Sequence, residues 1–318
     1  MKVLVTGGAG FIGSHLAHAL VKRGDRVRII DNLSAGAMKN LKAVSKEVEF
    51  QKGDIRNPAA LRKAMKGVEV VYHQAALRSV PKSVDNPSGY HDVNVTATFH
   101  IFQLARELGI KRVVYASSSS VYGDGTPLPQ KETALAKPQS PYAASKLATE
   151  VYGGMFMRLF GLETVGLRYF NVYGPRQSLE NKYAVAVPKF IISVLRGEQP
   201  PIHGNGKQTR DFTYVDNVVQ ANIKSATAPA SKASGEAFNI ASGDSHSVLE
   251  LALLIAKIFK SDLKPRFISK RPGDVMHTWA DIGKAKKQLG FKVGVSFQEG
   301  VRRTAEWFDQ NRSEWNLT

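Results

Sequence analysis

A glycine-rich turn between residues 6 and 13 constrains the fold of this chain more than any other feature. The apolar run Lys2–Thr6 precedes the turn and predicts a β-strand, and Ser14–Arg23 follows with apolar residues at helical spacing. The glycines that fit the G-x-G-x-x-G spacing or its close variant are Gly7, Gly8, Gly10 and Gly13. Such glycines permit a tight turn and let the backbone approach a pyrophosphate, which the free N–H groups at the helix start can bind. The turn therefore predicts a dinucleotide-binding strand–turn–helix unit.

Strand and helix patterns alternate through the first 170 residues. The predicted strands are Lys2–Thr6, Arg26–Asp31, Val48–Gln51, Val68–His73, Lys111–Ser117 and Thr164–Tyr169. The predicted helices are Ser14–Arg23, Leu61–Met65, Asp92–Leu108 and Tyr142–Leu159. Several strands are nearly continuous apolar runs, which indicates that helices cover both faces of the sheet. The pattern predicts an α/β fold, with a doubly wound parallel sheet of the Rossmann type.

The pattern changes after about residue 170, where loops become rich in proline and glycine. Helical spacing recurs at Val187–Leu195, Val248–Phe259 and Phe297–Phe308. We expect residues 1–170 to form the dinucleotide-binding domain, to which residues 211–235 return. The remainder of 171–318 then forms a smaller C-terminal α/β domain that binds the substrate.

Composition excludes several kinds of chemistry. The chain has no cysteine, so disulfides, thiolate nucleophiles and zinc–thiolate or iron–sulfur sites are ruled out, and we predict no metal site. No segment resembles a signal peptide and no apolar run is long enough to span a bilayer, so we expect a cytoplasmic protein without a membrane partner. The net charge of +17 fits either a polyanion or a diphosphate-bearing ligand. Because the basic residues are scattered rather than clustered, we favour the small ligand over nucleic acid.

Polar residues after the next strands complete the predicted cofactor site. Asp31 ends the second strand, where a carboxylate accepts ribose hydroxyls and repels a 2′-phosphate, which favours NAD over NADP. Asp54 follows the third strand and could either bond the adenine amino group or cap a helix. Small residues at Ala75 and Ala76 would let the backbone lie along the cofactor. The predicted cofactor-binding residues are Gly7, Gly10, Phe11, Ile12, Gly13, Asp31, Asn32, Asp54, Ile55, Ala75, Ala76, Asn94, Tyr142 and Lys146.

A tyrosine and a lysine at the start of a later helix predict acid–base chemistry. Tyr142 and Lys146 are four residues apart, which places both side chains on one helix face. A nearby ammonium group and the positive nicotinamide of NAD would stabilise a phenolate and make Tyr142 a base near neutral pH. Ser118 ends the fifth strand, at the edge where ligands bind in such sheets, and could hydrogen-bond a reacting oxygen.

Together these features resemble the extended short-chain dehydrogenase/reductase superfamily and, within it, the nucleotide-sugar 4-epimerases. The resemblance covers essentially the whole chain, through the motifs Thr6–Gly13, His73–Leu77, Asn94, Ser117–Gly123, Tyr142–Lys146, Leu167–Gln177, Gly204–Asp216 and Arg271–Asp274. It implies that Tyr142, Lys146 and Ser118 are catalytic and that the protein is a homodimer. The substrate-binding residues it implies are Arg78, Ser118, Ser119, Asn171, Val187, Arg210, Arg271, Asp274 and Thr278.

The resemblance implies NAD-dependent 4-epimerisation of a UDP-hexose through a transient 4-keto sugar. Sugar dehydratases carry an acidic pair where Ser119 and Ser120 stand, which argues against water elimination, and Asn171 favours a neutral sugar. The small Thr278 would admit an acetamido group, so we expect UDP-glucose and UDP-galactose as substrates, with UDP-GlcNAc also accepted. Arg78 keeps a UDP-glucuronate 4-epimerase open, because it could contact a substrate carboxylate or a cofactor phosphate. A non-enzymatic NAD- or RNA-binding protein is the alternative from another class.

Overall fold

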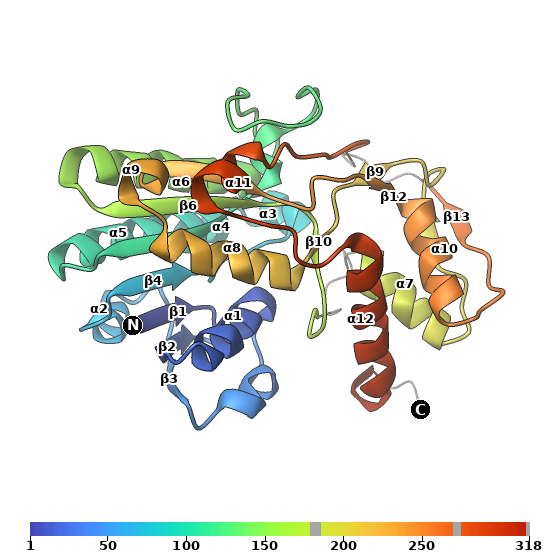
Figure 1. Ribbon diagram of the computed structural model, residues 1–318, viewed down its shortest axis with the longest axis horizontal. Helices are drawn as coiled ribbons and strands as arrows, with labels where there is room; N and C mark the ends of the chain where they lie inside the picture. The colour runs from blue at the N-terminus through green and yellow to red at the C-terminus, as the bar shows by residue number, and fades with distance from the viewer. Residues whose placement is uncertain (179–185, 270–274, 316–318) are drawn as a thin grey trace.

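The computed structural model describes residues 1–178, 186–269 and 275–315. A seven-stranded parallel sheet forms its larger lobe, with strand order β11-β6-β5-β4-β1-β2-β3 (Figure 1). The strands are β1 (Lys2–Thr6), β2 (Arg26–Asp31), β3 (Val48–Lys52), β4 (Val70–His73), β5 (Arg112–Ser118), β6 (Glu163–Tyr169) and β11 (Glu236–Ile240). This order confirms the predicted doubly wound parallel sheet, since the chain winds outward in both directions from β1.

Helices pack on both faces of this sheet. Alternate residues of β1 enter different cores: Val3 and Val5 lie in one and Leu4 in the other, because side chains alternate along a strand. One face packs against α1 (Phe11–Lys22), α8 (Val215–Thr227) and α11 (Gly283–Leu289). The other packs against α2 (Pro58–Met65), α5 (Ala97–Glu107) and α6 (Pro141–Phe160). The shorter helical segments of this lobe are η1 (Met38–Val44), α3 (Val80–Asp85), α4 (Pro87–Tyr90), η2 (His91–Thr96), η3 (Ser119–Tyr122) and α9 (Ala230–Ala233).

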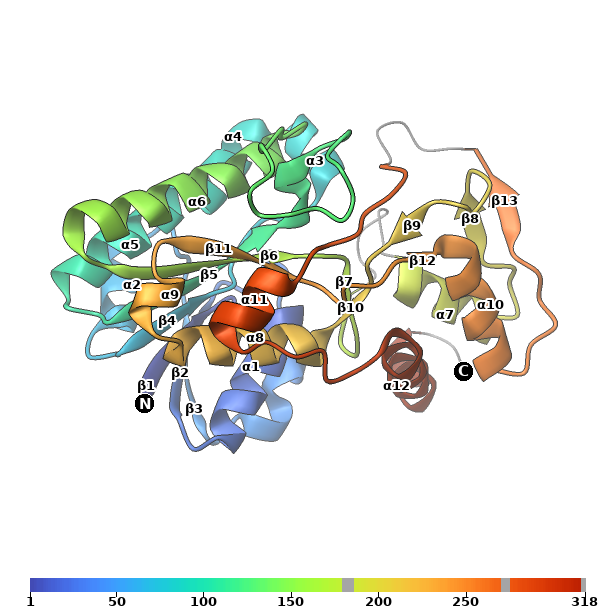
Figure 2. The same ribbon diagram turned by 45° about the horizontal axis from the view of Figure 1, so that its top comes forward.

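A smaller lobe lies beside the sheet and has its own apolar core (Figure 2). Its main helices are α7 (Ala186–Leu195), α10 (Val248–Ile258) and α12 (Phe297–Gln310), with η4 (Arg312–Trp315) after the last. Short strands pair in this part of the chain: β7 (Val172–Tyr173) with β10 (Thr213–Tyr214), β8 (Pro201–His203) with β13 (Arg266–Ile268), and β9 (Thr209–Arg210) with β12 (His246–Ser247). The first of these pairs links the smaller lobe to the sheet lobe, because β7 comes directly after β6. None of the helices in the described ranges combines the length and hydropathy needed to cross a bilayer.

The predicted strands agree with the observed ones within two residues at each end. The seventh strand, Glu236–Ile240, was not predicted, because it is an edge strand that lies in the half of the chain where the alternation is lost. It follows α8, which the stretch 211–235 contributes. The predicted helix Asp92–Leu108 is divided into a π-helical turn, η2, and α5. Such turns are rare and frequently occur at functional sites.

Candidate active site

The turn after β1 forms a cradle that only glycine can line. A Cβ at Gly13 would lie 2.1 Å from the carbonyl oxygen of Gly7, so the strand and helix could not approach as they do. Gly7 has φ +68°, and a Cβ there would lie 2.8 Å from the backbone of Ala75. Helix α1 is capped by Gly10 without a side-chain hydrogen bond, and its first turn carries no acidic residue. The N–H groups of Phe11, Ile12 and Gly13 therefore begin a helix that is open to an anion, as a pyrophosphate requires.

Asp31 is fixed at the end of β2 by two backbone donors. One carboxylate oxygen accepts a hydrogen bond from the N–H of Ala9 at 2.9 Å, and the other from the N–H of Leu33 at 2.7 Å. Each carboxylate oxygen retains acceptor capacity, because an ionised carboxylate offers about four sites in all. The residue thus has the position and the free acceptors that ribose hydroxyls need.

Asp54 pairs with an arginine and does not cap the next helix. The cap of α2 is Asn57, whose side chain accepts hydrogen bonds from Ala59 and Ala60. Hydrogen bonds from Arg56, one of them at 2.8 Å, hold the pKa of Asp54 well below its usual range. Asn32 also donates to this carboxylate at 2.9 Å, whereas the neighbouring Ile55 is buried in the core.

The loop after β4 is held from two sides. The N–H of Ala75 donates to the hydroxyl of Thr6 at 3.2 Å, and Ala76 follows in the same partly exposed stretch. Asn94, in the π-helical turn, both accepts from the N–H of Leu77 and donates to its carbonyl, each at 2.9 Å. The same amide donates to Ser145 of α6 at 3.0 Å, so Asn94 joins this loop to the helix that carries the predicted base.

Tyr142 lies in the first turn of α6, whose N-terminus is well defined by a cap and a proline. Ser140 caps the helix by accepting a hydrogen bond from Ala143 at 3.1 Å, and Pro141 occupies the first helical position. Burial raises the pKa of Tyr142, whereas a hydrogen bond with Ser118 and the charge of Arg78 lower it. The structure thus brings together Tyr142, Ser118 and Arg78, which are more than sixty residues apart along the chain at their extremes.

Lys146 lies one turn further along α6 and faces the end of β5. Its ammonium donates to the carbonyl oxygen of Ala116 at 2.8 Å. Burial lowers the pKa of Lys146 to about 8, against the opposing influence of Glu150. The expected effect of this ammonium on the pKa of Tyr142 stays a prediction.

Ser118 and Ser119 lie where β5 ends and η3 begins. The Ser118 hydroxyl accepts a hydrogen bond from the N–H of Ser120 at 3.2 Å and donates to the Ser120 hydroxyl at 3.1 Å. Ser118 is buried, and Ser119 is partly exposed. The serine run thus forms a turn that places the Ser118 hydroxyl beside Tyr142.

On the side of the smaller lobe, Asn171 and Thr278 bind one another. The Asn171 amide donates to the Thr278 hydroxyl at 3.0 Å and to the carbonyl oxygen of Asp211 at 3.2 Å. Asn171 has φ +31°, a backbone conformation that is uncommon outside glycine and that recurs at functional sites. Arg210 donates to the carbonyl oxygens of Thr209 at 2.8 Å and of Met276 at 3.2 Å.

Two of the predicted substrate residues, Arg271 and Asp274, lie outside the described residues. A third, Val187, is fully buried in the core of the smaller lobe, and its assignment to the substrate stays a prediction. The resemblance to the family implied the assignment, and the apolar face of α7 on which Val187 lies turns inward.

Residues that the sequence did not indicate connect α6 with β6. Glu150 forms a buried ion pair with Arg168, with an N–O distance of 2.7 Å, and accepts a hydrogen bond from Ser117. Arg168 also donates to the hydroxyl of Tyr122 at 2.9 Å. The pair lies next to Lys146, and no spacing rule could have found it, because it joins a helix to a strand across the sheet.

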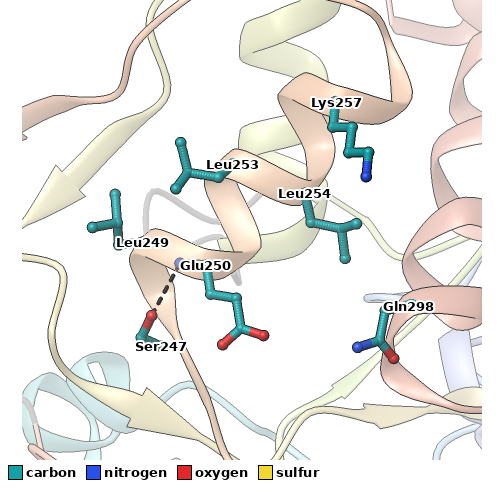
Figure 3. Close-up of a pocket in the computed structure, with 7 residues that line it drawn as sticks. All are labelled: Ser247, Leu249, Glu250, Leu253, Leu254, Lys257 and Gln298. Atoms are coloured by element: carbon teal, nitrogen blue, oxygen red, sulfur yellow. Dashed lines mark hydrogen bonds between the residues drawn. The ribbon is translucent and has the colours of Figure 1, made fainter.

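A hollow of about 420 Å³ lies on the smaller lobe, away from the predicted site (Figure 3). Leu253 and Leu254 on α10 line it, together with Glu250, Lys257 and Gln298. None of its lining residues belongs to the predicted site.

Five strands of the sheet end at this site. Asp31 and Ser118 are the last residues of β2 and β5, and the glycine turn, the Ala75 loop and Asn171 come after β1, β4 and β6. The carboxyl ends of these strands share one edge of the sheet because the strands are parallel. Ligands of doubly wound sheets bind at that edge. The cradle and the carboxylate fit a dinucleotide, and the tyrosine, lysine and serine fit proton transfer beside it.

The fold and this site define an NAD-dependent enzyme of the short-chain dehydrogenase/reductase superfamily. The chain belongs to the NAD dependent epimerase/dehydratase family, whose family model matches residues 3–241, and NAD is its cofactor. A UDP-glucose 4-epimerase of Mycolicibacterium smegmatis is 39% identical over 99% of this chain and 100% of its own.

Two solved structures are similar over nearly their whole length. The UDP-N-acetylglucosamine 4-epimerase of Methanobrevibacter ruminantium, in complex with UDP-N-acetylmuramic acid, has a TM-score of 0.92 and 41% identity, covering 97% of this chain and 98% of its own. The UDP-glucose 4-epimerase of Thermus thermophilus, in complex with NAD, has a TM-score of 0.88 and 34% identity, covering 98% and 100%.

Proposed function

We propose that this protein is a UDP-sugar 4-epimerase that acts on UDP-glucose and UDP-galactose and also accepts UDP-GlcNAc. The observation that carries the proposal is the meeting of Tyr142 with Ser118 at the edge of the sheet that also holds the dinucleotide cradle. A base and a hydrogen-bond donor that lie side by side can act on the same sugar hydroxyl, one by taking its proton and the other by hydrogen-bonding its oxygen. The similarity to relatives named as UDP-sugar 4-epimerases supports the same conclusion.

In this mechanism, Tyr142 in its phenolate form takes the proton from the C4 hydroxyl. The cofactor that the glycine turn and Asp31 would hold supplies reversible hydride chemistry at C4 when it is bound. Ser118 hydrogen-bonds the reacting oxygen and keeps it against the tyrosine, and Lys146 would hold the nicotinamide ribose. After the 4-keto sugar has turned about its bonds to the diphosphate, Tyr142 returns the proton to the same oxygen on the other face. Ser119 and Ser120 offer no acid to expel water, so the cycle ends in epimerisation.

The diphosphate and nucleotide would lie against the smaller lobe. Asn171 and Arg210 are our candidates for the diphosphate, together with Arg271, and Asp274 is our candidate for the uridine ribose. The backbone carbonyls that Arg210 binds here are exchangeable partners, because a guanidinium has five donors and pairs more strongly with phosphate.

We also propose that the enzyme is a cytoplasmic homodimer with the domain division inferred from the sequence. On α6, Val151 is 61% exposed and Leu159 is 68% exposed, and the neighbouring Phe160 is also exposed. Large apolar side chains at this exposure on one helix are typical of a surface that another subunit covers.

One experiment separates the substrates. The NAD-loaded protein is incubated with UDP-glucose, UDP-GlcNAc and UDP-glucuronate in separate reactions, and the C4 epimers are followed by NMR, with Tyr142→Phe as the inactive control. Epimerisation of UDP-glucose, and more slowly of UDP-GlcNAc, is the expected result. Turnover of UDP-glucuronate alone would reject the neutral-sugar assignment and favour Arg78 as the carboxylate ligand. No turnover of any of them, with salt-dependent RNA binding, would favour the non-enzymatic alternative.

A further inference from the structure

Glu150 is a buried carboxylate on α6, one turn beyond Lys146, and it accepts hydrogen bonds from two strands. Its side chain is 9% exposed. One carboxylate oxygen accepts from the Ser117 hydroxyl and, at 2.9 Å, from Nε of Arg168, and the other accepts from a terminal nitrogen of Arg168 at 2.7 Å. Such a two-bond contact fixes the direction of a carboxylate as well as its distance. Because burying both charges costs much of the energy that their attraction returns, stability alone does not explain the pair.

The two donors lie opposite one another near the carboxyl ends of β5 and β6. Ser117 and Arg168 are direct partners in the register of these parallel strands. Ser117 immediately precedes Ser118, the last residue of β5, and Arg168 lies three residues before Asn171. Glu150 therefore joins α6 to both strands close to the edge of the sheet where the candidate site lies.

Lys146 and Glu150 bind consecutive residues of β5 from the same face of α6. They are four residues apart on a continuous helix, so their side chains are neighbours. The Lys146 ammonium donates to the carbonyl oxygen of Ala116 at 2.8 Å, and Glu150 accepts from the Ser117 hydroxyl. The negative charge of Glu150 also favours the ammonium form of Lys146, against the effect of burial on its pKa.

Arg168 extends the network to the turn after Ser118. Its other terminal nitrogen donates to the hydroxyl of Tyr122 at 2.9 Å, and this hydroxyl donates to the side-chain oxygen of Asn239 at 2.6 Å. Tyr122 is the last residue of η3, the turn that the serine run forms. The network of Glu150 thus reaches Ser118 from both sides, through the residue before it and through the turn after it.

We propose that Glu150 is a positioning residue of the reaction, which holds Ser118 at the end of β5 in register with Tyr142 and Lys146 on α6. This inference rests on the proposed function, in which these three residues act on the substrate and the cofactor. Reacting groups have to be held closely, because a displacement of about 1 Å can cost about 10²-fold in rate.

A second ion pair joins the same two strands at their other ends and offers a matched control. Arg112 and Glu163 are the first residues of β5 and β6 and are also direct partners in register. Arg112 is buried, and its Nε donates to Glu163 at 2.7 Å. Its remaining bonds go to the carbonyl oxygens of Ser225 and Ala228. Loss of the Glu163 charge therefore leaves a buried arginine unpaired, far from the catalytic groups.

The charged and titratable groups around Lys146 among the described residues lie on three elements. Tyr142 and Glu150 share α6 with it, His73 lies on β4, and Arg168 lies on β6. Burial and the charge of Lys146 lower the pKa of His73 to about 3, so this ring stays neutral. Glu150 is thus the anion of this group, and its loss should be read in the ionisation of Lys146.

The test compares Glu150→Gln, Ser117→Ala and Glu163→Gln in the NAD-loaded protein. Thermal unfolding and NAD content report folding, and kcat and KM are measured with UDP-glucose. The ionisation of Lys146 is followed without turnover, from the pH dependence of its Cε resonance in protein with ¹³C-labelled lysine, which Lys146→Arg assigns by its loss. Ser117→Ala keeps both buried charges, so it tests the link to β5 even if Glu150→Gln does not fold.

We expect Ser117→Ala to lower kcat about tenfold with little change in KM, since it loosens the strand end and leaves the binding residues in place. Glu150→Gln should lower kcat further and make Lys146 lose its proton at lower pH, because the neighbouring negative charge is gone. Glu163→Gln should lower the Tm as Glu150→Gln does, but leave kcat and the Lys146 titration unchanged.

Any one of three results would overturn the inference. They are an unchanged kcat in Ser117→Ala, an unchanged Lys146 titration in Glu150→Gln, and a loss of kcat in Glu163→Gln equal to that in Glu150→Gln, which would mean that both pairs only stabilise the sheet. If the unmodified protein turns over no UDP-sugar, the proposed function fails, and the Lys146 titration still decides whether Glu150 acts on the lysine.

Discussion

The Lys146 ammonium donates a hydrogen bond to the carbonyl oxygen of Ala116 at 2.8 Å, two residues before the serine that ends β5. This bond holds the lysine against the end of the strand, on the side where a bound nicotinamide ribose would lie.

The decline of kcat/KM at alkaline pH should depend on the ionisation of Lys146. Burial lowers the pKa of Lys146 to about 8, so the side chain is charged below that pH and neutral above it. If the ammonium holds the cofactor ribose, kcat/KM falls as the pH rises through about 8. Lys146→Arg should lower the rate but abolish this descending limb, because arginine keeps its charge. A limb that persists in Lys146→Arg would show that another group causes it.

Removal of the phenol hydroxyl should abolish the chemistry and leave binding intact. Tyr142→Phe should lose about 10²–10⁴-fold in kcat, the usual contribution of a general acid–base group, while NAD content and UDP-sugar affinity stay near normal. Ser118→Ala should lose less, since it removes one hydrogen bond to the reacting oxygen. Tyr152→Phe, on the same helix and outside the site, serves as the control. Normal turnover in Tyr142→Phe would mean that the base lies elsewhere.

The dinucleotide turn should not accept an added methyl group at Gly13. Gly13→Ala places a Cβ 2.1 Å from the Gly7 carbonyl, so strand and helix must separate, at a cost of about 1–3 kcal/mol typical of overpacking. We expect loss of copurified NAD and a lower Tm. Gly294→Ala, at an exposed glycine whose nearest atom would be 3.8 Å away, should keep both. Calorimetric titration with NAD and thermal unfolding measure the two effects.

Thr278 offers a test of sugar choice. A tyrosine there would fill the space that an acetamido group needs, so Thr278→Tyr should reduce turnover of UDP-GlcNAc by about 10–200-fold more than that of UDP-glucose. Because the Thr278 hydroxyl also binds Asn171 at 3.0 Å, Thr278→Val is the matched control that removes the hydrogen bond and keeps the size. Equal losses for both sugars in both variants would assign Thr278 to holding Asn171.

The apolar surface of α6 should mediate self-association. Val151→Glu places a charge at a side chain that is 61% exposed in the single chain, and it should convert a dimer to a monomer in light scattering. Leu253→Glu makes the same kind of change at a leucine of α10 that is 53% exposed, and should leave the dimer unchanged. A monomeric unmodified protein at micromolar concentration would contradict the proposal.

The strands of the sheet could be predicted because each of them depends on residues that are close together in the sequence. Each inner strand is a short apolar run with a helix pattern after it, and the glycine turn marks where the first strand ends. The edge strand Glu236–Ile240 escaped prediction because it is held by pairing with β6, a partner more than sixty residues earlier in the chain. The helix cap at Asn57 was likewise missed, since either Asp54 or Asn57 has a side chain suited to the role.

The sequence by itself determined the parallel sheet, the dinucleotide turn and the pairing of Tyr142 with Lys146, since each depends on spacing within one segment. Tertiary structure alone decided how the loop after β4 meets α6, because Asn94 and the Tyr90 ring join segments that are about fifty residues apart in the sequence. It also decided that Val187 packs in a core. Electrostatic and packing energies depend on distances in space, and distant segments acquire those distances only when the chain folds.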